Sequence, residues 1–276
     1  MKIAFQGELG AYSHLAALEL YPKADIITCT TFDECFKLAQ KDNQCNIIIP
    51  IENSLAGRVA DIQYLIPKYK LQIYAEYFHP VNHYLLGVPG SKLNKVKYVR
   101  SHSQAISQCQ NIITKYNLQP IISADTAGSA KFISENNKTS EVAIASSLSA
   151  KIYNLDILDK KIQDSSGNVT RFLIMGKESK HPELKNKKYI TSCIFRVKSK
   201  PAALYKCLGG FATNNINLSK LESFSAKNTF EQFNFFIDIE GHIEEPGIQK
   251  SLEELGFHTE SLDILGVYEA DSFRNK

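Results

Sequence analysis

The first part of the chain alternates short apolar runs with segments in which apolar residues recur every three or four positions. Runs rich in Ile, Val and Phe predict strands, and the longer periodic segments predict helices. The expected strands are Lys2–Gln6, Ile26–Thr30, Ile47–Ile51, Tyr98–Arg100, Gln119–Ile122 and Val142–Ala145. The expected helices are Tyr12–Leu20, Phe32–Gln40, Asn53–Tyr64, Gln104–Lys115 and Thr126–Ser134. This alternation is typical of an α/β protein built from βαβ units, with a parallel sheet and ligand sites at the strand ends.

A polar segment without apolar periodicity follows and predicts a linker over residues 178–188. Beyond it the pattern changes to the order strand, helix, strand, strand, helix, strand. The expected elements are Ile190–Lys198, Ala202–Thr213, Leu218–Ser225, Phe230–Glu240, Pro246–Leu255 and Ser261–Tyr268. The order βαββαβ predicts a ferredoxin-like unit of roughly 80 residues.

Composition narrows the class of protein. The 276 residues are 43% hydrophobic and 22% charged, which is ordinary for a globular protein and excludes a disordered chain. The longest stretch free of Asp, Glu, Lys and Arg runs only from Tyr77 to Ser91, whereas a membrane span needs about 20 apolar residues. No signal peptide is expected, and six cysteines without a C-x-x-C pair indicate the reduced thiols of a cytoplasmic protein. The net charge of +3 does not by itself indicate nucleic acid as a partner.

Two glycines mark the first junction between a strand and a helix. The strand ending at Gln6 runs into Gly7 and Gly10 before the helix begins at Tyr12. Backbone N–H groups at a helix N-terminus bind anions, and Ser13 adds a hydroxyl. The first G-x-G of a dinucleotide fingerprint is missing, and a tight βα turn explains the same residues.

A second polar cluster follows a buried strand at Glu52, Asn53 and Ser54. Ligands bind at this place in an α/β sheet. Asn53 and Ser54 can donate to a carboxylate or a hydroxyl, while Glu52 is either a base or a charge at the helix start. A helix N-cap explains one of the three residues but not all of them.

Two further junctions repeat this layout, at Ser101-His102-Ser103-Gln104 and at Asp125-Thr126. An unperturbed histidine titrates near neutrality, which suits acid–base chemistry. A lone histidine is also a common surface cap, and Asp125 reads as an N-cap. The local sequence leaves both interpretations open.

The segment Asp164–Ile174 takes a polar loop into an apolar strand, and Thr170, Arg171 and Phe172 lie where the two meet. Arginine holds a carboxylate through paired hydrogen bonds, and a neighbouring threonine hydroxyl can donate to a leaving oxygen. An ordinary strand start with a surface arginine explains the same residues.

The chain lacks G-x-S-x-G, H-E-x-x-H, Walker and kinase motifs and any cluster with metal-ligand spacing, so neither a cofactor nor a metal is expected.

Taken together, the motifs resemble those of prephenate dehydratases in content and order. The matching segments are Gly7–Ser13 (GELGAYS), Pro50–Ser54 (PIENS), Ser101–Ala105 (SHSQA) with Gln108-Cys109, Asp125–Gly128 (DTAG), Ala143–Ser146 (AIAS) and Asn168–Phe172 (NVTRF). The C-terminal part resembles the regulatory ACT domain of those enzymes through Leu204-Tyr205-Lys206, Phe211, Ile216–Leu218, Glu222-Ser223 and Leu265-Gly266.

The resemblance implies two α/β lobes like those of periplasmic binding proteins, followed by a ferredoxin-like ACT domain. The implied catalytic domain covers residues 1–177, with lobes over about 1–76 plus 165–177 and over 77–164; the ACT domain covers 189–270. The implied enzyme is a carbon–oxygen lyase that converts prephenate to phenylpyruvate, water and CO2 on the way to phenylalanine. No chorismate mutase segment precedes Met1, so the monofunctional form is expected.

The resemblance also assigns roles to residues. Thr170 is the catalytic residue and donates a hydrogen bond or proton to the departing hydroxyl. The implied substrate-binding residues are Gly10, Ala11, Tyr12, Ser13, Glu52, Asn53, Ser54, Ser101, His102, Gln104, Thr126, Asn168, Arg171 and Phe172. Positive charge on the ring carboxylate would oppose its loss as CO2. We therefore expect neutral donors there and Arg171 on the pyruvyl carboxylate.

For regulation, the resemblance implies phenylalanine as effector and a homodimer or homotetramer. The implied regulatory residues are Ala202, Ala203, Leu204, Asn217, Leu218, Glu222 and Ser223. The chain departs from the family pattern at Ala202, which is usually Gly, and at Phe224 and Ser225, which are usually Arg and Pro. A Cβ at residue 202 would oppose the close approach of a ligand to the backbone, so the sequence leaves phenylalanine inhibition open.

Two alternatives to a prephenate dehydratase remain at this point. An arogenate dehydratase performs the same elimination on the amino analogue, and no residue of the sequence decides between the substrates. A sensor that closes on an aromatic acid without reacting would share the two-lobed fold, but it would have no need of a threonine aligned with a leaving hydroxyl. Neither nucleic acid nor a membrane is an expected partner, because the chain has no stripe of basic and aromatic residues and no apolar span.

Overall fold

The computed structural model describes residues 1–59, 62–177, 181–198, 200–225 and 233–275. Contacts between Cα atoms divide the chain into two compact units. The first comprises Met1–Cys35, Ile48–Ala60 and Phe78–Phe172, and the second comprises Phe36–Ile47, Asp61–Tyr77 and Leu173–Lys276. Within the described ranges, no helix is long and apolar enough to cross a membrane.

The first sheet has the strand order β2-β1-β3-β11-β5, with the short β4 paired to β3. Its strands are β1 (Lys2–Gln6), β2 (Asp25–Cys29), β3 (Cys45–Asn53), β4 (Gly57–Arg58), β5 (Gln72–Pro80) and β11 (Val169–Gly176). The helices between them are α1 (Tyr12–Leu20), α2 (Phe32–Lys41) and α3 (Leu65–Tyr69). Strands β1 and β2 run parallel, as expected for a βαβ unit.

The second sheet has the order β10-β6-β9-β7-β8. Its strands are β6 (Tyr84–Gly87), β7 (Tyr98–Ser101), β8 (Gln119–Ile122), β9 (Glu141–Ala145) and β10 (Asp156–Lys160). The helices are α4 (Ser103–Ser107), α5 (Gln110–Lys115), α6 (Thr126–Glu135) and α7 (Ser147–Ile152), with a 3₁₀ turn at Leu93–Lys95. Strand β7 is parallel to both β8 and β9, whereas β6 is antiparallel to β9 and β10, so the sheet is mixed.

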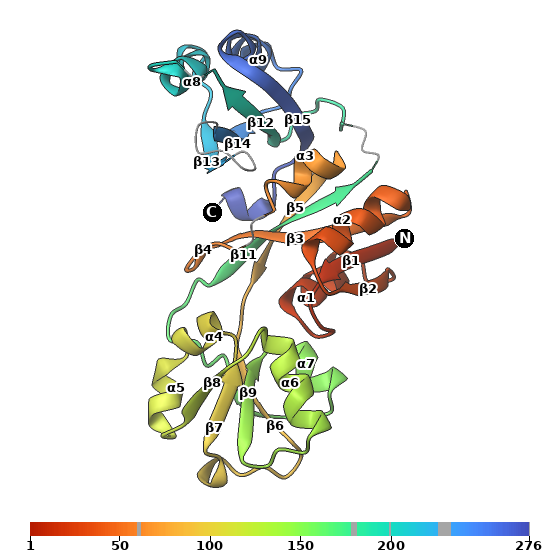
Figure 1. Ribbon diagram of the computed structural model, residues 1–276, viewed down its shortest axis with the longest axis vertical. Helices are drawn as coiled ribbons and strands as arrows, with labels where there is room; N and C mark the ends of the chain where they lie inside the picture. The colour runs from red at the N-terminus through yellow and green to blue at the C-terminus, as the bar shows by residue number, and fades with distance from the viewer. Residues whose placement is uncertain (60–61, 178–180, 199, 226–232, 276) are drawn as a thin grey trace. The chain divides into compact units, whose positions relative to one another are not determined.

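Helices cover both faces of this second sheet (Figure 1). Val142 and Ile144 of β9 pack in one cluster with residues of α4 and α5, and Ala143 and Ala145 pack in another with residues of α6 and α7. Because side chains alternate along a strand, a strand covered on both faces reads as a continuous apolar run. That is why β9 is recognisable in the sequence.

The C-terminal sheet is antiparallel with the order β13-β14-β12-β15. Its elements are β12 (Tyr189–Val197), α8 (Ala203–Thr213), β13 (Leu218–Ser225), β14 (Phe233–Glu240), α9 (Pro246–His258) and β15 (Thr259–Glu269), followed by a 3₁₀ turn at Ser272–Asn275. This is the predicted ferredoxin-like βαββαβ arrangement. Its core joins Phe195 and Ile237 of the sheet to Phe211 of α8 and Leu255 of α9. The predicted fold class, an α/β region followed by an antiparallel domain, is confirmed.

The helix predicted over Asn53–Tyr64 is wrong for residues 53–59 and 62–64, and residues 60–61 lie outside the described residues. Strand β3 continues to Asn53, and the chain then turns back into the two-residue β4. The amide oxygen of Asn53 accepts hydrogen bonds from the backbone N–H groups of Leu55 and Ala56, and Gly57 has φ of +72°. An asparagine that holds its own turn, followed by a left-handed glycine, favours a hairpin over a helix.

The single helix predicted over Gln104–Lys115 is two short helices, α4 and α5. The break lies at Cys109, whose φ and ψ of −130° and 35° are not helical. The carboxylate of Asp164 accepts hydrogen bonds from the N–H groups of Gln110 and Asn111, which stabilises a second helix start. Of the predicted strand Phe230–Glu240, residues 230–232 lie outside the described residues. So do residues 178–180 of the predicted linker, and residues 181–188 form neither helix nor strand.

Candidate active site

A cavity of about 220 Å³ lies in the first unit, where strands β1 and β3 end and where strand β11 and helices α1, α4 and α6 begin. Its lining residues are Gln6, Gly7, Ala11, Tyr12, Ser13, Pro50, Asn53, Val59, Val81, His83, His102, Gln104, Ala105, Gln108, Asp125, Thr126, Asn168, Thr170 and Phe172. Ligand sites of α/β proteins are found at such strand ends. A single cavity therefore brings together the polar junctions that the sequence marks separately.

The start of α1 contributes backbone and hydroxyl groups. Ala11 is the N-cap, and Tyr12 and Ser13 begin the helix. The N–H groups of the first helical turn have no partner within the helix and carry partial positive charge. Gly10 stands apart, because its N–H donates to His14 Nδ1 and its carbonyl accepts from the hydroxyls of Ser146 and Ser149. Gly10 therefore positions the loop and does not line the cavity.

Thr170 sits at the start of β11 and is 7% exposed. Its Oγ1 lies 3.0 Å from Asn53 Nδ2, an N–H donor. The hydroxyl therefore accepts a hydrogen bond from the protein, and its own proton is left for a group in the cavity. Phe172, two residues along the strand, lines the same cavity.

Asn53 and Asn168 form a pair beside Thr170. Asn53 Nδ2 donates to Asn168 Oδ1 over 2.7 Å, and Asn168 Nδ2 donates to Gln108 Oε1 over 2.9 Å. The same Gln108 oxygen lies 2.9 Å from His83 Nε2. The second nitrogen of that ring, Nδ1, lies 2.7 Å from the Tyr12 hydroxyl. Burial lowers the pKa of His83, so the neutral ring is favoured.

Helices α4 and α6 complete the cavity wall. His102 is the N-cap of α4, and its Nδ1 accepts from the N–H of Gln104 over 3.3 Å. Asp125 is the N-cap of α6 and accepts from the N–H of Gly128 over 2.5 Å. Both caps are thus local, as the simpler interpretation of the sequence predicts, yet both side chains also line the cavity.

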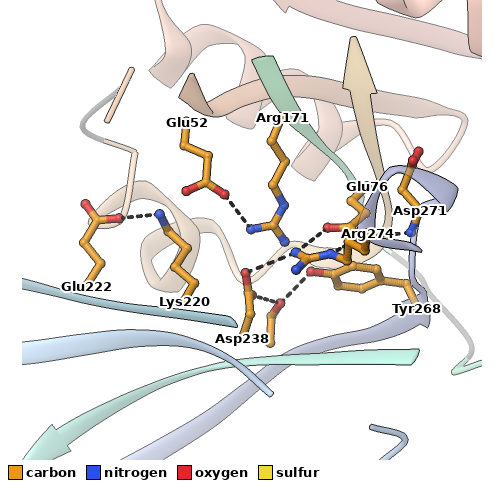
Figure 2. Close-up of polar contacts among 10 residues, drawn as sticks. Glu52, Glu76, Arg171, Lys220, Glu222, Asp238, Tyr268, Asp271 and Arg274 are labelled. Atoms are coloured by element: carbon orange, nitrogen blue, oxygen red, sulfur yellow. Dashed lines mark hydrogen bonds and ion pairs between the residues drawn. The ribbon is translucent and has the colours of Figure 1, made fainter. Parts of the chain in front are cut away.

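The structure places Arg171 away from the cavity. Strand side chains alternate, so Arg171 lies on the face of β11 opposite to Thr170 and Phe172. It is 1% exposed, and its Nη1 lies 3.1 Å from Glu52 Oε1 (Figure 2). The guanidinium is also 5.9 Å from the ring centre of Phe78. The contact between Arg171 and the pyruvyl carboxylate expected from the sequence is therefore not supported, and neither is a substrate contact by Glu52.

Two other residues expected in the binding site serve the fold. The Ser54 hydroxyl donates to the carbonyl of Gly167 and accepts from the N–H of Val169, which fastens the loop before β11. Ser101 is fully buried and donates to the carbonyl of Ile144. Of the residues proposed from the sequence, the cavity retains Ala11, Tyr12, Ser13, Asn53, His102, Gln104, Thr126, Asn168, Thr170 and Phe172.

His83 and Gln108 also line the cavity, although neither is expected there from the sequence. His83 stands in an apolar stretch and gave no polar pattern, although a buried histidine commonly has a hydrogen-bond partner. Gln108 belongs to a motif segment, but its place on the cavity wall depends on the break between α4 and α5. No lysine or arginine lines the cavity, within the residues that the structure describes. Backbone N–H groups and neutral side chains are therefore the donors for an anionic ligand.

Comparison with known proteins identifies the family. The sequence model described as prephenate dehydratase matches residues 3–180. The chain belongs to the prephenate dehydratase family. Accordingly it is an enzyme, and its class is that of the carbon–oxygen lyases.

Individual relatives agree with this assignment. The chain is 40% identical to a bifunctional N-acyl-homoserine lactone acylase/prephenate dehydratase of Komagataeibacter europaeus, over 99% of this chain and 98% of the relative. It is 37% identical to arogenate dehydratase/prephenate dehydratase 1 of Arabidopsis thaliana, over 99% and 73%. The structure of prephenate dehydratase from Arthrobacter aurescens in complex with L-Phe superposes with a TM-score of 0.87 at 25% identity, over 98% of this chain and 90% of that one.

In this prephenate dehydratase family member, the second unit contains a further cavity, of about 470 Å³. It is lined by Val197, Lys198, Lys200, Pro201, Ala202, Ala203, Leu204, Tyr205 and Phe233. Three of the predicted regulatory residues, Ala202, Ala203 and Leu204, are thus at one cavity. The others lie elsewhere in the domain: Leu218 packs against its core, and the carbonyl of Asn217 accepts from the N–H of Glu240.

Glu222 and Ser223 lie on strand β13. Glu222 Oε2 lies 3.2 Å from Lys220 Nζ (Figure 2), and Glu222 Oε1 accepts from Gln63 Nε2 over 3.1 Å. Ser223 stands opposite Phe235 of β14. The Glu222 carboxylate therefore binds two residues of its own unit.

Ala202 keeps the backbone conformation that a glycine favours. It precedes α8 with φ of 60° and ψ of 20°, in the left-handed region. We expect Ala202→Gly to raise the free energy of unfolding by about 0.5–1 kcal/mol, because it relieves the Cβ clash of that conformation. Ala203→Gly is the matched control, since it places glycine in the first turn of α8 and should be destabilising. Urea denaturation measures both, and a less stable Ala202→Gly protein would contradict the prediction.

Proposed function

We propose that this protein converts prephenate to phenylpyruvate, CO2 and water in the cavity beside Thr170. The observation that carries the proposal is the hydrogen bond from Asn53 Nδ2 to Thr170 Oγ1, which leaves the hydroxyl proton for the cavity. The overall reaction takes up one proton: the prephenate dianion and a proton give phenylpyruvate anion, CO2 and water. The C–O bond to the ring hydroxyl and the C–C bond to the ring carboxylate break, and the electron pair of the C–C bond completes the aromatic ring.

Thr170 would donate its hydrogen bond to the oxygen of the departing hydroxyl. A threonine is a weak acid in water, so its contribution depends on placement in a site that excludes water. The hydroxyl is nearly buried, and Phe172 beside it offers an apolar surface for the ring. Aromatisation supplies the driving force, which leaves orientation of the substrate as the main task of the protein.

The carboxylates would be held by neutral donors. The cavity presents the first-turn N–H groups of α1 and the side chains of Ser13, Gln104 and Thr126. A fixed cation at the ring carboxylate would stabilise the negative charge that decarboxylation must remove. A lining without lysine or arginine among the described residues supports the loss of CO2.

Arogenate is the second candidate substrate, and Asp125 is the observation that favours it. Arogenate carries an ammonium group where prephenate has a keto oxygen, and the Asp125 carboxylate lines the cavity. We expect Asp125→Asn to lower kcat/KM for arogenate about tenfold more than it lowers kcat/KM for prephenate. Only arogenate has an ammonium group that loses its charge partner. Asparagine also caps helices, so α6 is retained. Equal losses for both substrates would contradict this role.

The experiment that tests the proposed function compares the two substrates directly. Purified protein is incubated with prephenate and, separately, with arogenate, and phenylpyruvate and phenylalanine are quantified. We expect turnover of prephenate. Tight binding of either acid without turnover would instead indicate a sensor.

One relative is named for acylase activity as well, and the assay includes an N-acyl-homoserine lactone as a third arm. Acyl transfer by a threonine needs a base within hydrogen-bond reach of its hydroxyl. The group beside Thr170 is the Asn53 amide, which is not a base. The geometry at Thr170 therefore favours elimination over acyl transfer.

We also propose that the cavity beside Ala202 binds L-phenylalanine and that the protein is cytoplasmic. Support for the effector comes from the L-Phe complex of the Arthrobacter aurescens relative and from the 470 Å³ volume of the cavity. Support for the location comes from the six buried cysteines, which fit a reducing compartment. Calorimetric titration with L-phenylalanine tests the effector site, and Ala202→Gly shows whether the Cβ at that position weakens binding.

A further inference from the structure

The orientation of three amide groups fixes the tautomer of a buried histidine that does not touch Thr170. The amides belong to Asn53, Asn168 and Gln108, and the histidine is His83, which is 3% exposed. All four side chains line the cavity. The backbone determines the orientation of the Asn53 side chain.

Asn53 Oδ1 accepts hydrogen bonds from the N–H groups of Leu55 and Ala56, at 3.0 and 2.9 Å. Only an oxygen can accept, so the NH₂ group of Asn53 must face the other way, toward Asn168, Thr170 and the carbonyl of Val169. Asn168 consequently presents its oxygen to Asn53, and the distance of 2.7 Å fits that assignment.

With its oxygen facing Asn53, Asn168 directs its NH₂ group to Gln108 over 2.9 Å. Gln108 must then present its oxygen, because two NH₂ groups in contact would repel each other. That oxygen also lies 2.9 Å from His83 Nε2. A carbonyl oxygen only accepts, so His83 Nε2 must carry a proton.

The other ring nitrogen completes the chain. In neutral His83, a proton on Nε2 leaves a lone pair on Nδ1, and the Tyr12 hydroxyl at 2.7 Å donates to it. The hydroxyl also donates to the carbonyl of Asn82 over 2.9 Å, so its single proton is shared between that carbonyl and His83 Nδ1. The backbone of His83 is itself held, since its N–H donates to Gln163 Oε1 and its carbonyl accepts from the N–H of Ile162. The ring therefore cannot change its place without breaking several contacts.

We infer that His83, protonated at Nε2 and held by Tyr12, is a positioning residue for Thr170. It holds Gln108 and Asn168 in the orientation that makes Asn53 a donor to the Thr170 hydroxyl. Without it, the Gln108 amide is free to rotate. The direction of hydrogen-bond donation among Gln108, Asn168 and Asn53 is then no longer fixed. The inference rests on the proposed role of Thr170 and names what sets the direction of its hydroxyl proton.

Substitution of His83 tests the inference through kinetics. His83→Asn does not reach Gln108, and we expect kcat for prephenate to fall roughly 10- to 100-fold with a smaller change in KM. His83→Gln places an amide NH₂ near the position of Nε2, and we expect it to restore kcat to within about fivefold of wild type. His242→Asn is the matched control, because His242 is a buried, hydrogen-bonded histidine of the C-terminal domain. Unchanged kcat in His83→Asn would overturn the inference.

A double-mutant cycle separates positioning from a general effect on structure. If His83 acts through Thr170, then adding His83→Asn to Thr170→Val causes no further loss of kcat. A further loss equal to that seen in the wild-type background would overturn the inference while leaving the role of Thr170 intact. If Thr170→Val alone keeps full kcat, the proposed function of Thr170 fails, whatever the behaviour of His83.

The tautomer itself can be observed in the unsubstituted protein, with one variant used only to assign the signal. Nitrogen-15 NMR of histidine-labelled protein at pH 7 distinguishes a ring nitrogen that carries a proton from one that does not, and His83→Gln assigns the signal. We expect a protonated Nε2 and an unprotonated Nδ1 for His83. The opposite tautomer would overturn the inference.

Discussion

Thr170→Val is expected to lower kcat for prephenate by roughly 10²–10³-fold, the usual loss when one placed donor to a developing charge is removed. Valine has nearly the shape of threonine but cannot donate to the departing hydroxyl. Binding of the carboxylates does not involve this hydroxyl, so KM should change little. Steady-state kinetics with purified protein measures both constants.

Two controls accompany this substitution. Thr170→Ser keeps a hydroxyl at the same Cβ and should retain far more activity than the valine variant. Thr191→Val is the matched control, because Thr191 is a fully buried strand threonine of the C-terminal domain whose hydroxyl donates to the carbonyl of Gly241. The free energy of unfolding of the Thr191→Val protein should fall by about 1 kcal/mol, with kcat unchanged. A Thr170→Val protein that folds and retains full activity would refute the mechanism.

The second large effect is expected at Gly266, where strand β15 approaches strand β5 in the second unit. A Cβ at Gly266 would overlap the carbonyl oxygen of Ile73, and the carbonyl carbon of Ile73 would lie only 2.8 Å away. Backbone cannot rotate aside as a side chain can. We therefore expect Gly266→Ala to lower the free energy of unfolding by roughly 3 kcal/mol, the upper part of the range for overpacking. Guanidinium denaturation measures the change.

Gly256→Ala is the matched control for Gly266→Ala. Gly256 lies in α9, and a Cβ there would meet no atom within 4 Å. Alanine is the better helix former, so stability should rise by up to about 1 kcal/mol. A Gly266→Ala protein as stable as its Gly256→Ala counterpart would show that the close approach of β15 to Ile73 is not a feature of the folded protein.

Much of the fold follows from patterns that are local in the sequence. Strand β9 is buried on both faces and reads as an unbroken apolar run, and α1 begins and ends at the predicted residues. The prediction failed at Asn53–Tyr64, where apolar residues continue but an asparagine-held turn and a left-handed Gly57 make a hairpin. Turn chemistry outweighed periodicity at that point. Limits of the two lobes remain a prediction.

The site was less predictable than the fold. The alternation of side chains along β11 is a local signal that Thr170 and Arg171 face opposite ways, and it outweighs the ability of arginine to bind a carboxylate. The positions of His83 and Gln108 had no such signal. Their contact joins residues 25 positions apart through a helix break that Asp164 stabilises from elsewhere in the chain. Contacts of this kind depend on tertiary structure and not on any sequence period.

The most direct test of the account is the stoichiometry of the reaction itself. Purified protein is added to prephenate at neutral pH, and phenylpyruvate and CO2 are quantified against a blank without protein. The account predicts that both products form in a one-to-one ratio with the prephenate consumed, at a rate that Thr170→Val lowers by roughly 10²–10³-fold. Consumption of prephenate no faster than the blank, or equal rates for the two proteins, would contradict it.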